Sequence, residues 1–439
     1  MKLSKINLLI IHGIFGFVLT RYSFLSTYYG LFIILLGTYF ILEKPDPNEK
    51  YPLVFSAYIV GLEVLLRMTG ANLFWEFGKY AMIYFLILGL LRKNNRVQIF
   101  SPILLYFLLL LPAILYVPLD SLTLWRQNIS FNLSGPAALT ISSIYFFNKK
   151  VERKTLNQVL FYMILPIVSI AIYNLFTMPD LLTYRFSPYS DFYTSGGFGP
   201  NQVSTIFGLG IVGLFTAQVL GFNLTGSKYI DILVLIIFFG LGLITFSRGG
   251  IFAAIISSII AITYYLFHEQ KIYYMILKGF GFLFASITAW VIIVSITDGI
   301  ISERYGFGKS ESGERLILDL TGRTLIYEID INIFHDNVFT GVGPGQAFKL
   351  REEYGYGKQV AAHTEYSRML AEHGILGLIS LIILIAVSIF HLSKHNSVTN
   401  KFIRILFGIL ALLTMGHSAM RLVMPAFVYG FLFSKYENS

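Results

Sequence analysis

The stretch that decides the fold is YIDILVLIIFFGLGLITFSRGGIFAAIISSIIAITYYLF, residues 229–267. It contains two apolar runs, 229–246 and 250–267, with almost no polar chain between them. A helix needs roughly 20 apolar residues to cross the hydrocarbon core of a bilayer. We therefore predict two membrane-spanning helices that meet in the tight turn FSRGG, residues 246–250.

Similar apolar runs recur along the whole chain of 439 residues. The chain is 55% hydrophobic and only 13% charged, whereas a soluble domain has roughly 25% charged residues. We therefore predict an all-α fold, a polytopic helical integral membrane protein with about 12–14 transmembrane helices. Beyond the two runs already named, the others lie near residues 6–22, 26–42, 52–68, 73–91, 101–117, 130–147, 158–176, 202–220, 273–296, 374–392, 402–419 and 422–434.

The charge distribution argues against nucleic-acid binding, although the formal net charge is +9. The polar segment 297–373 holds 8 Lys and Arg against 12 Asp and Glu, which gives it −4 and leaves +13 for the rest. Much of the positive charge lies in short loops such as RKNNR (92–96) and NKKVERK (148–154), which share one side if the runs alternate. Basic loops mark the cytoplasmic side. We therefore expect segments 184–202, 246–250 and 297–373 on the outer face.

The long outer loop, 297–373, is expected to contain two helices. The stretch RTLIYEIDINIFH, residues 323–335, places four apolar residues at helical spacing: Ile326, Ile329, Ile333 and Phe334. This pattern is typical of an amphipathic helix on or near the membrane surface. The turn GVGPG, residues 341–345, ends it. A second helix, about 362–373, should end at Gly374, because glycine is the commonest residue after a helix.

Three arginines carry the first functional hypothesis. Arg248 lies in the turn FSRGG, Arg185 opens an outer segment that ends GGFGPNQ, and Arg323 starts the amphipathic helix. An arginine at membrane depth is costly and often functional, and its planar guanidinium matches phosphate oxygens. We therefore expect an anion-binding group on the outer face; the alternative is an ordinary loop or interfacial arginine at each position. Asn201 is expected to cap the span that follows the GGFGPNQ turn.

The stretch VAAHTEYSRMLAEHG, residues 360–374, carries the second hypothesis. On a helix, Glu365 and Glu372 stand three and four residues from Arg368, the spacing of intrahelical ion pairs. His363 begins this helix, and a histidine can accept a proton at neutral pH. The functional interpretation of His363 is a general base, and the structural interpretation is a capping or solvated histidine.

No metal ion or cofactor is expected, and the chain contains no cysteine. A zinc site would have to be assembled from His335, His363 and His373, which follow no ligand spacing such as HExxH. Charged residues also occur inside predicted spans, where we expect structural ion pairs, with a channel-lining role as the alternative. Helical spacing pairs Glu63 with Arg67 and Glu76 with Lys79.

Four stretches carry a family resemblance. They are RFSPYSDFYTSGGFGPN (185–201), TFSRGG (245–250), GRTLIYEIDINIFHDNVFTGVGPGQAF (322–348) and AHTEYSRMLAEHGILGLI (362–379). Together they resemble the O-antigen ligase and O-antigen polymerase superfamily of bacterial membrane glycosyltransferases. The resemblance covers roughly residues 184–380. The sequence departs from the family pattern at Thr364, where asparagine is common, and at GPN, which stands where the family has Asn-Pro-Asn.

The resemblance implies a GT-C-like, metal-independent glycosyltransferase. It would move a glycan from undecaprenyl diphosphate to an acceptor hydroxyl, on lipid A-core in a ligase or on another glycan in a polymerase. His363 would be the general base. The diphosphate would be bound by Arg185, Arg248 and Arg323. Glu365 or Glu372 would orient the histidine or its loop. The rest of the substrate-binding site would be formed by Gly343, Gly345, Asn201 and Ser247.

We favour a ligase, because the histidine block before the last spans is more typical of ligases. A repeat-unit polymerase is the alternative within the superfamily, and a small-anion transporter is the alternative of another class. A transporter concentrates its polar residues near the bilayer midplane, whereas here they gather in outer loops. The expected division is N-terminal spans (1–176), a catalytic region (177–392), and last spans with a short cytoplasmic tail (393–439). We expect a monomer in the bacterial inner membrane, with a periplasmic site and only substrates and membrane lipids as partners.

Overall fold

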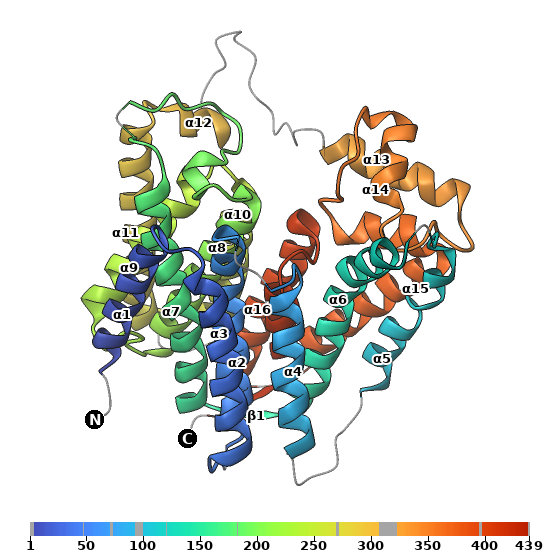
Figure 1. Cartoon of the computed structure of the whole chain (residues 1–439). Coiled ribbons are helices and arrows are strands. Elements are labelled where there is room, and N and C mark those ends of the chain that lie inside the picture. The colour runs from blue at the N-terminus through green and yellow to red at the C-terminus, as the bar shows by residue number, and fades with distance from the viewer. Residues whose placement is uncertain are drawn as a thin grey trace.

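The computed structural model describes residues 4–437 except 47, 71–72, 93–99, 120, 182, 269–271, 307–322 and 395–396. This part of the chain is a bundle of helices with one small two-stranded sheet (Figure 1). Seven helices in the described ranges are long and apolar enough to cross a membrane: α2 (Leu25–Glu43), α3 (Lys50–Met68), α7 (Arg153–Thr177), α8 (Pro200–Leu220), α10 (Arg248–His268), α15 (Glu365–Ser393) and α16 (Val398–Ser418). The predicted all-α membrane fold is confirmed.

The remaining predicted runs also form helical segments. They are α1 (Lys5–Leu19), α4 (Phe77–Arg92), α5 (Ser101–Leu108) with η1 (Pro112–Tyr116), α6 (Leu122–Phe146), α9 (Lys228–Ile244), α11 (Ile272–Ile296) and α17 (Met424–Tyr429) with η4 (Gly430–Phe433). The segment Met424–Phe433 is too short to cross the hydrocarbon core. Instead it is buried in the protein, in contact with α6 and α16.

Helix packing brings together three spans: the one that follows the FSRGG turn, the one that precedes α9, and the last long span. α10 packs against both α8 and α16. A Cβ atom added at Gly250 would lie 2.3 Å from the carbonyl carbon of Ser204 in α8. Only glycine therefore allows α10 to approach α8 this closely, which explains one of the two glycines that follow Arg248.

The outer segment contains α12 (Ile300–Arg304), which continues from α11, and a small unit beside α15 (Figure 1). The unit comprises α13 (Arg323–Asp336), α14 (Ala347–Arg351) and the π-helical turn η3 (Glu352–Tyr356). The predicted apolar face of α13 exists: Ile326, Ile329 and Ile333 are buried. Much of it packs against α14 and α15, in a cluster with Ala347 and Ala371, so protein rather than a membrane surface covers it.

α15 is interrupted at Gly374, whose φ of 57° and ψ of −139° are not helical. The predicted break between an outer helix and a span is therefore confirmed, although the outer helix begins at Glu365. The amide of Ile375 donates to the carbonyl oxygen of Val338 at 2.6 Å. A Cβ atom at Gly374 would lie 2.5 Å from that same oxygen, so the break requires glycine.

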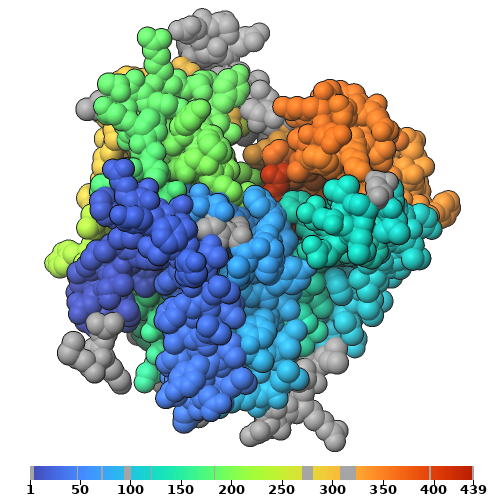
Figure 2. All heavy atoms as spheres, in the orientation of Figure 1, coloured from blue at the N-terminus to red at the C-terminus, as the bar shows by residue number. Residues whose placement is uncertain are grey.

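The two ends of the bundle differ. At one end, β1 (Lys150–Glu152) pairs in parallel with β2 (Lys435–Glu437), which joins the C-terminal residues to the basic loop before α7. At the other end lie the loop before α8, with the short helix η2 (Tyr193–Ser195), and the α13–α14 unit (Figure 1). The space-filling view shows a recess between the green segment and the orange α13–α14 unit, with red C-terminal residues at its base (Figure 2).

Candidate functional site

A cavity of about 540 Å³ lies along α10 and α16. Arg248 is the first residue of α10 and His417 the next to last of α16, so both polar residues stand at the same end of two packed helices. The apolar lining residues lie one to two turns further into the spans: Phe252, Ala253, Ile256, Ile409, Leu412 and Leu413. Ile256 is eight residues beyond Arg248, which is about 12 Å along the helix. The cavity is therefore polar at the loop end and apolar at membrane depth.

Three arginines line the polar end of this cavity, which we call the arginine cavity. Nη1 of Arg248 donates to the carbonyl oxygen of Arg304 at 3.0 Å. Nε of Arg304 donates in return to the carbonyl oxygen of Phe246 at 3.0 Å, so α12 is fastened to the FSRGG turn. Arg323, in the first turn of α13, is the third; burial and the neighbouring Arg248 lower its pKa.

Arg185 is placed differently from the other two predicted arginines. Its side chain is exposed in the loop between α7 and α8 and lines neither the arginine cavity nor the second cavity described below. The next residue, Phe186, stacks on Phe246 with ring centroids 5.7 Å apart. The structure thus brings Arg248 and Arg323 together and leaves Arg185 at the surface of an adjacent segment.

His363 lies just before α15, and Thr364 rather than His363 caps that helix through the amide of Tyr366. Burial, together with the charges of Arg421, Arg323 and Arg351 and with the His417 ring, lowers the pKa of His363 to about 3. The imidazole is therefore neutral at pH 7 and can accept a hydrogen bond or a proton. Its Nδ1 is buried and has no hydrogen-bond partner among the described residues.

The histidines considered for a zinc site do not form one in the described part of the chain. His335 is exposed on α13, whereas His373 is buried in α15. Among the residues with described placement, no group of three His, Asp or Glu side chains could hold a metal ion.

Glu365 and Glu372 both pair with Arg368, as their spacing predicts. Arg368 forms a close ion pair with Glu365, and its Nη1 lies 2.7 Å from Oε2 of Glu372. Glu365 also accepts a hydrogen bond from the amide of Met420 at 3.3 Å. The adjacent amide of Ala419 donates to the carbonyl oxygen of His363 at 3.1 Å. Glu365 and the backbone of His363 therefore hold the same chain segment, the linker 419–423 between α16 and α17.

A second cavity, of about 860 Å³, lies between α4, α6 and the outer unit, and we call it the aromatic cavity. Four exposed aromatic side chains line it: Phe74, Trp75, Tyr80 and Phe348. Amide groups of Gln127, Asn128 and Asn132 line it as well. Gly345 lies at its wall with φ of 80°, and a Cβ atom there would come within 2.9 Å of Nδ2 of Asn132. Gly343, with φ of 89°, instead approaches the backbone of Tyr116.

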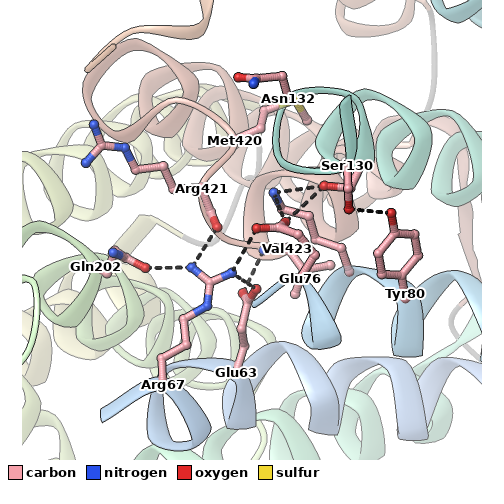
Figure 3. A network of polar contacts seen from close by, with 12 residues as sticks. Glu63, Arg67, Glu76, Tyr80, Ser130, Asn132, Gln202, Met420, Arg421 and Val423 are labelled. Carbon is pink, nitrogen blue, oxygen red and sulfur yellow. Dashed lines mark hydrogen bonds and ion pairs between the residues drawn. The ribbon is translucent and has the colours of Figure 1, made fainter. Parts of the chain in front are cut away.

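Arg421 lines the aromatic cavity and forms hydrogen bonds to the segment before His363. Its Nη2 donates to the carbonyl oxygens of Ala361 and Ala362 at 3.2 and 2.7 Å. Its own carbonyl oxygen accepts a hydrogen bond of 2.9 Å from Arg67 (Figure 3). Burial lowers the pKa of Arg421 to about 10, and the neighbouring arginines contribute to this shift.

The two ion pairs predicted inside α3 and near α4 are present (Figure 3). Glu76 lines the aromatic cavity. Glu63 and Arg67 are 2.8 Å apart, and Glu76 and Lys79 are 2.5 Å apart. Oε2 of Glu63 also accepts from the amide of Val423 at 2.7 Å. The Glu63–Arg67 pair therefore holds the linker 419–423 against α3, whereas Glu76 accepts a hydrogen bond from Ser134 of α6 at 2.9 Å. Both are structural uses of buried charge.

The prediction that Asn201 caps α8 is wrong. Gly199 occupies the N-cap position, and no side chain caps the helix there. Asn201 instead contacts His417, through its Oδ1 3.1 Å from Nδ1 of the ring. Ser247, the other predicted polar binding residue, donates to the same Oδ1 at 3.4 Å. Neither Asn201 nor Ser247 lines a cavity described above.

Sequence reasoning missed four residues that surround the predicted histidine or line the arginine cavity: His417, Arg421, Arg304 and Arg351. The available signal was the stretch HSAMR, residues 417–421, which puts a histidine and an arginine at the outer end of an apolar run. Polar residues at such positions are energetically costly and are often functional. Arg304 and Arg351 had no comparable signal, because both lie in the polar outer segment.

Comparison with known families identifies a match over part of the chain. Residues 233–382 match the model of the O-antigen ligase family, Wzy_C, and no curated protein matches the chain. The matched segment runs from α9 into α15 and includes Arg248, Arg323 and His363 but not Arg185 or His417. The predicted resemblance is thereby confirmed, and the match supports a function of the ligase or polymerase type. This chain is a multi-pass membrane protein with a segment, residues 233–382, that matches the O-antigen ligase family.

Proposed function

We propose that the protein is a ligase that transfers a glycan from undecaprenyl diphosphate to an acceptor hydroxyl, such as one on lipid A-core, at the periplasmic face of the inner membrane. The observation that carries this proposal is the arginine cavity. Arg248 and Arg323 meet at its polar end, and apolar residues of α10 and α16 continue from there to membrane depth. A lipid diphosphate has the same two parts, an anionic head and an apolar tail.

The cationic end suits a diphosphate both as ligand and as leaving group. Guanidinium groups bind phosphate oxygens with paired, charge-assisted hydrogen bonds. Arg248 is fixed by its bond to the carbonyl oxygen of Arg304, so its charge is already in place before the donor arrives. Preorganised charge of this kind stabilises the negative charge that develops on the leaving group. In this proposal Arg185, at the exposed edge, contributes when the donor is bound.

In this proposal His363 acts between the two cavities. Ala361, Ala362 and Glu365 line the aromatic cavity, whereas Arg323 and His417, which act electrostatically on His363, line the arginine cavity. A general base has to stand between the acceptor and the bond that breaks. In the proposed step the acceptor oxygen attacks the anomeric carbon, and its proton passes to His363. The bond between that carbon and the diphosphate oxygen breaks, and undecaprenyl diphosphate leaves.

The aromatic cavity is the proposed acceptor site. Exposed aromatic rings such as Trp75 and Phe348 offer flat apolar faces to sugar rings, and amides such as Asn128 offer partners to sugar hydroxyls. A site for a glycan acceptor needs both aromatic faces for the sugar rings and amide groups for the hydroxyls. Gly345 keeps the wall of this cavity open, consistent with its predicted place in the substrate-binding site.

The test is a gel of surface glycolipid from the native organism after deletion of the gene. If the protein is a ligase, its deletion leaves finished polymer on the lipid carrier and bare core at the surface. If the protein is a polymerase, its deletion instead leaves core that carries a single repeat unit. A wild-type pattern in the deletion strain contradicts both and favours another acceptor or transport.

Complementation tests the role of His363. His363→Ala, expressed at the wild-type level, is expected to leave the deletion pattern unchanged, because the general base is missing. His335→Ala is the matched control, since His335 is exposed on α13 and lines neither cavity. Restoration of the wild-type pattern by His363→Ala contradicts the general-base assignment.

A further inference from the structure

His417 is held in one orientation by α8 and α10. Nδ2 of Asn201 donates to the carbonyl oxygen of His417 at 3.0 Å. A carbonyl oxygen only accepts, so this contact fixes which end of the Asn201 amide is the nitrogen. The amide oxygen is therefore the atom 3.1 Å from Nδ1 of His417. Because that oxygen only accepts, Nδ1 of the ring carries a hydrogen.

Two further contacts support this arrangement. The hydroxyl of Ser247 donates to the same oxygen of Asn201 at 3.4 Å. A Cβ atom added at Gly249 would lie 2.5 Å from Nδ1 of His417, so the imidazole packs directly on this glycine. The motifs GPN and SRGG, which sequence analysis assigned to substrate binding, thus converge on one histidine ring.

The other ring nitrogen of His417, Nε2, is available to bind a ligand. His417 lines the arginine cavity, and its Nε2 has no hydrogen-bond partner within the described residues. In the neutral ring with a hydrogen on Nδ1, Nε2 is a hydrogen-bond acceptor. An ionised phosphate also only accepts, so it cannot pair with this atom. A hydroxyl group close to the phosphate can.

We propose that His417 orients the donor sugar: its Nε2 accepts a hydrogen bond from a hydroxyl of the sugar attached to the diphosphate. Asn201, Ser247 and Gly249 are positioning residues that hold the ring for this contact. The inference rests on the proposed function, because it needs a diphosphate-linked sugar in the arginine cavity. The contact fixes the rotation of the sugar relative to His363, and such alignment of reacting groups is a large part of catalysis.

Two measurements separate this role from diphosphate binding. The first is the Kd of undecaprenyl diphosphate, which lacks the sugar, for purified full-length protein in nanodiscs. The second is the initial rate of glycan transfer in membranes of the deletion strain, which accumulate the native donor, after addition of purified protein. His417→Phe is expected to bind undecaprenyl diphosphate within about twofold of wild type and to transfer about tenfold more slowly, the value of one hydrogen bond.

Rescue and displacement variants test the geometry. His417→Gln is expected to recover part of the rate, because its side-chain oxygen can accept a hydrogen bond near the position of Nε2. Gly249→Ala is expected to slow transfer as His417→Phe does, because the added methyl group displaces the ring. Its matched control is Gly240→Ala, where the added Cβ atom meets only Ile293, at 3.9 Å.

Each contrary outcome has a distinct meaning. Transfer at the wild-type rate by folded His417→Phe or Gly249→Ala overturns the inference. A loss of undecaprenyl diphosphate binding in both His417→Phe and His417→Gln overturns it as well, since the ligand of His417 would then be the diphosphate. Wild-type protein that binds no undecaprenyl diphosphate overturns the proposed function itself, and this inference with it.

Discussion

Donor binding and protonation of His363 should be coupled. Burial and the charges of Arg421, Arg323 and Arg351 lower the pKa of His363 to about 3. A bound diphosphate brings negative charge to Arg323 and so weakens the effect of these cations on the ring. The pKa of His363 therefore rises when the donor binds. A base with so low a pKa becomes effective only beside its bound donor.

The size of the coupling follows from these pKa values. In the complex, burial still lowers the pKa of His363 from its ordinary value of 6.5, while the negative charge of the diphosphate raises it. If the pKa in the complex reaches about 6, the ring takes up a proton on binding at lower pH, and affinity rises by about tenfold between about pH 8 and about pH 5. The sign is fixed: a group whose pKa rises on binding makes the ligand bind more tightly as the pH falls.

The assay needs no turnover. The Kd of undecaprenyl diphosphate is measured across this pH range for wild-type protein and for His363→Gln, which keeps a polar side chain but does not titrate. Titration of the ligand and of His417 occurs in both proteins and cancels in the ratio of the two Kd values. A ratio that stays constant across the range refutes the electrostatic account of His363.

Three further predictions concern the walls of the site. Arg351→Met removes the ion-pair partner that lies 2.6 Å from the buried carboxylate of Asp330. The free energy of unfolding should therefore fall by about 3–5 kcal/mol in thermal unfolding, and most of it should return in Asp330→Leu/Arg351→Met. A double variant as unstable as the single one contradicts this. Trp75→Leu should raise the KM for acceptor about three- to tenfold without changing the Kd of undecaprenyl diphosphate, and a change only in the Kd would place the acceptor elsewhere. Ala419 has φ of 50° and ψ of −153°, so Ala419→Gly should stabilise the protein by about 1 kcal/mol; an unchanged or lower unfolding temperature argues against strain there.

The spans could be predicted from sequence because an apolar run is a local property. All fourteen runs coincide with helical segments, and the break at Gly374 was visible in the glycine itself. The length of a run says less about whether it crosses a membrane. Met424–Phe433 is apolar but buried within the protein, which depends on how α6 and α16 enclose it.

The candidate site could be predicted only where a motif marks it. Arg248 and His363 lie in stretches with recognisable patterns. Arg248 lines the arginine cavity, and His363 lies near Arg323 and His417, which also line it. His417 lies in no motif, and its place depends on α16 packing against α10. Asn201 was misassigned as a helix cap because the competing partner, the His417 ring, is 216 residues away in sequence. Contacts over such distances leave no local pattern.

The linker 419–423 sets a limit on modular exchange between related proteins. Its amides hold His363 and Glu365 on one side, and its other backbone groups are held by Glu63 and Arg67 of α3. The segment 233–382 that matches the ligase family therefore has its histidine anchored by residues outside both of its boundaries. A chimaera that transplants this segment alone would keep the motif and lose its support. Residues 417–423 and the Glu63–Arg67 pair have to be transplanted with it for the histidine to keep its position.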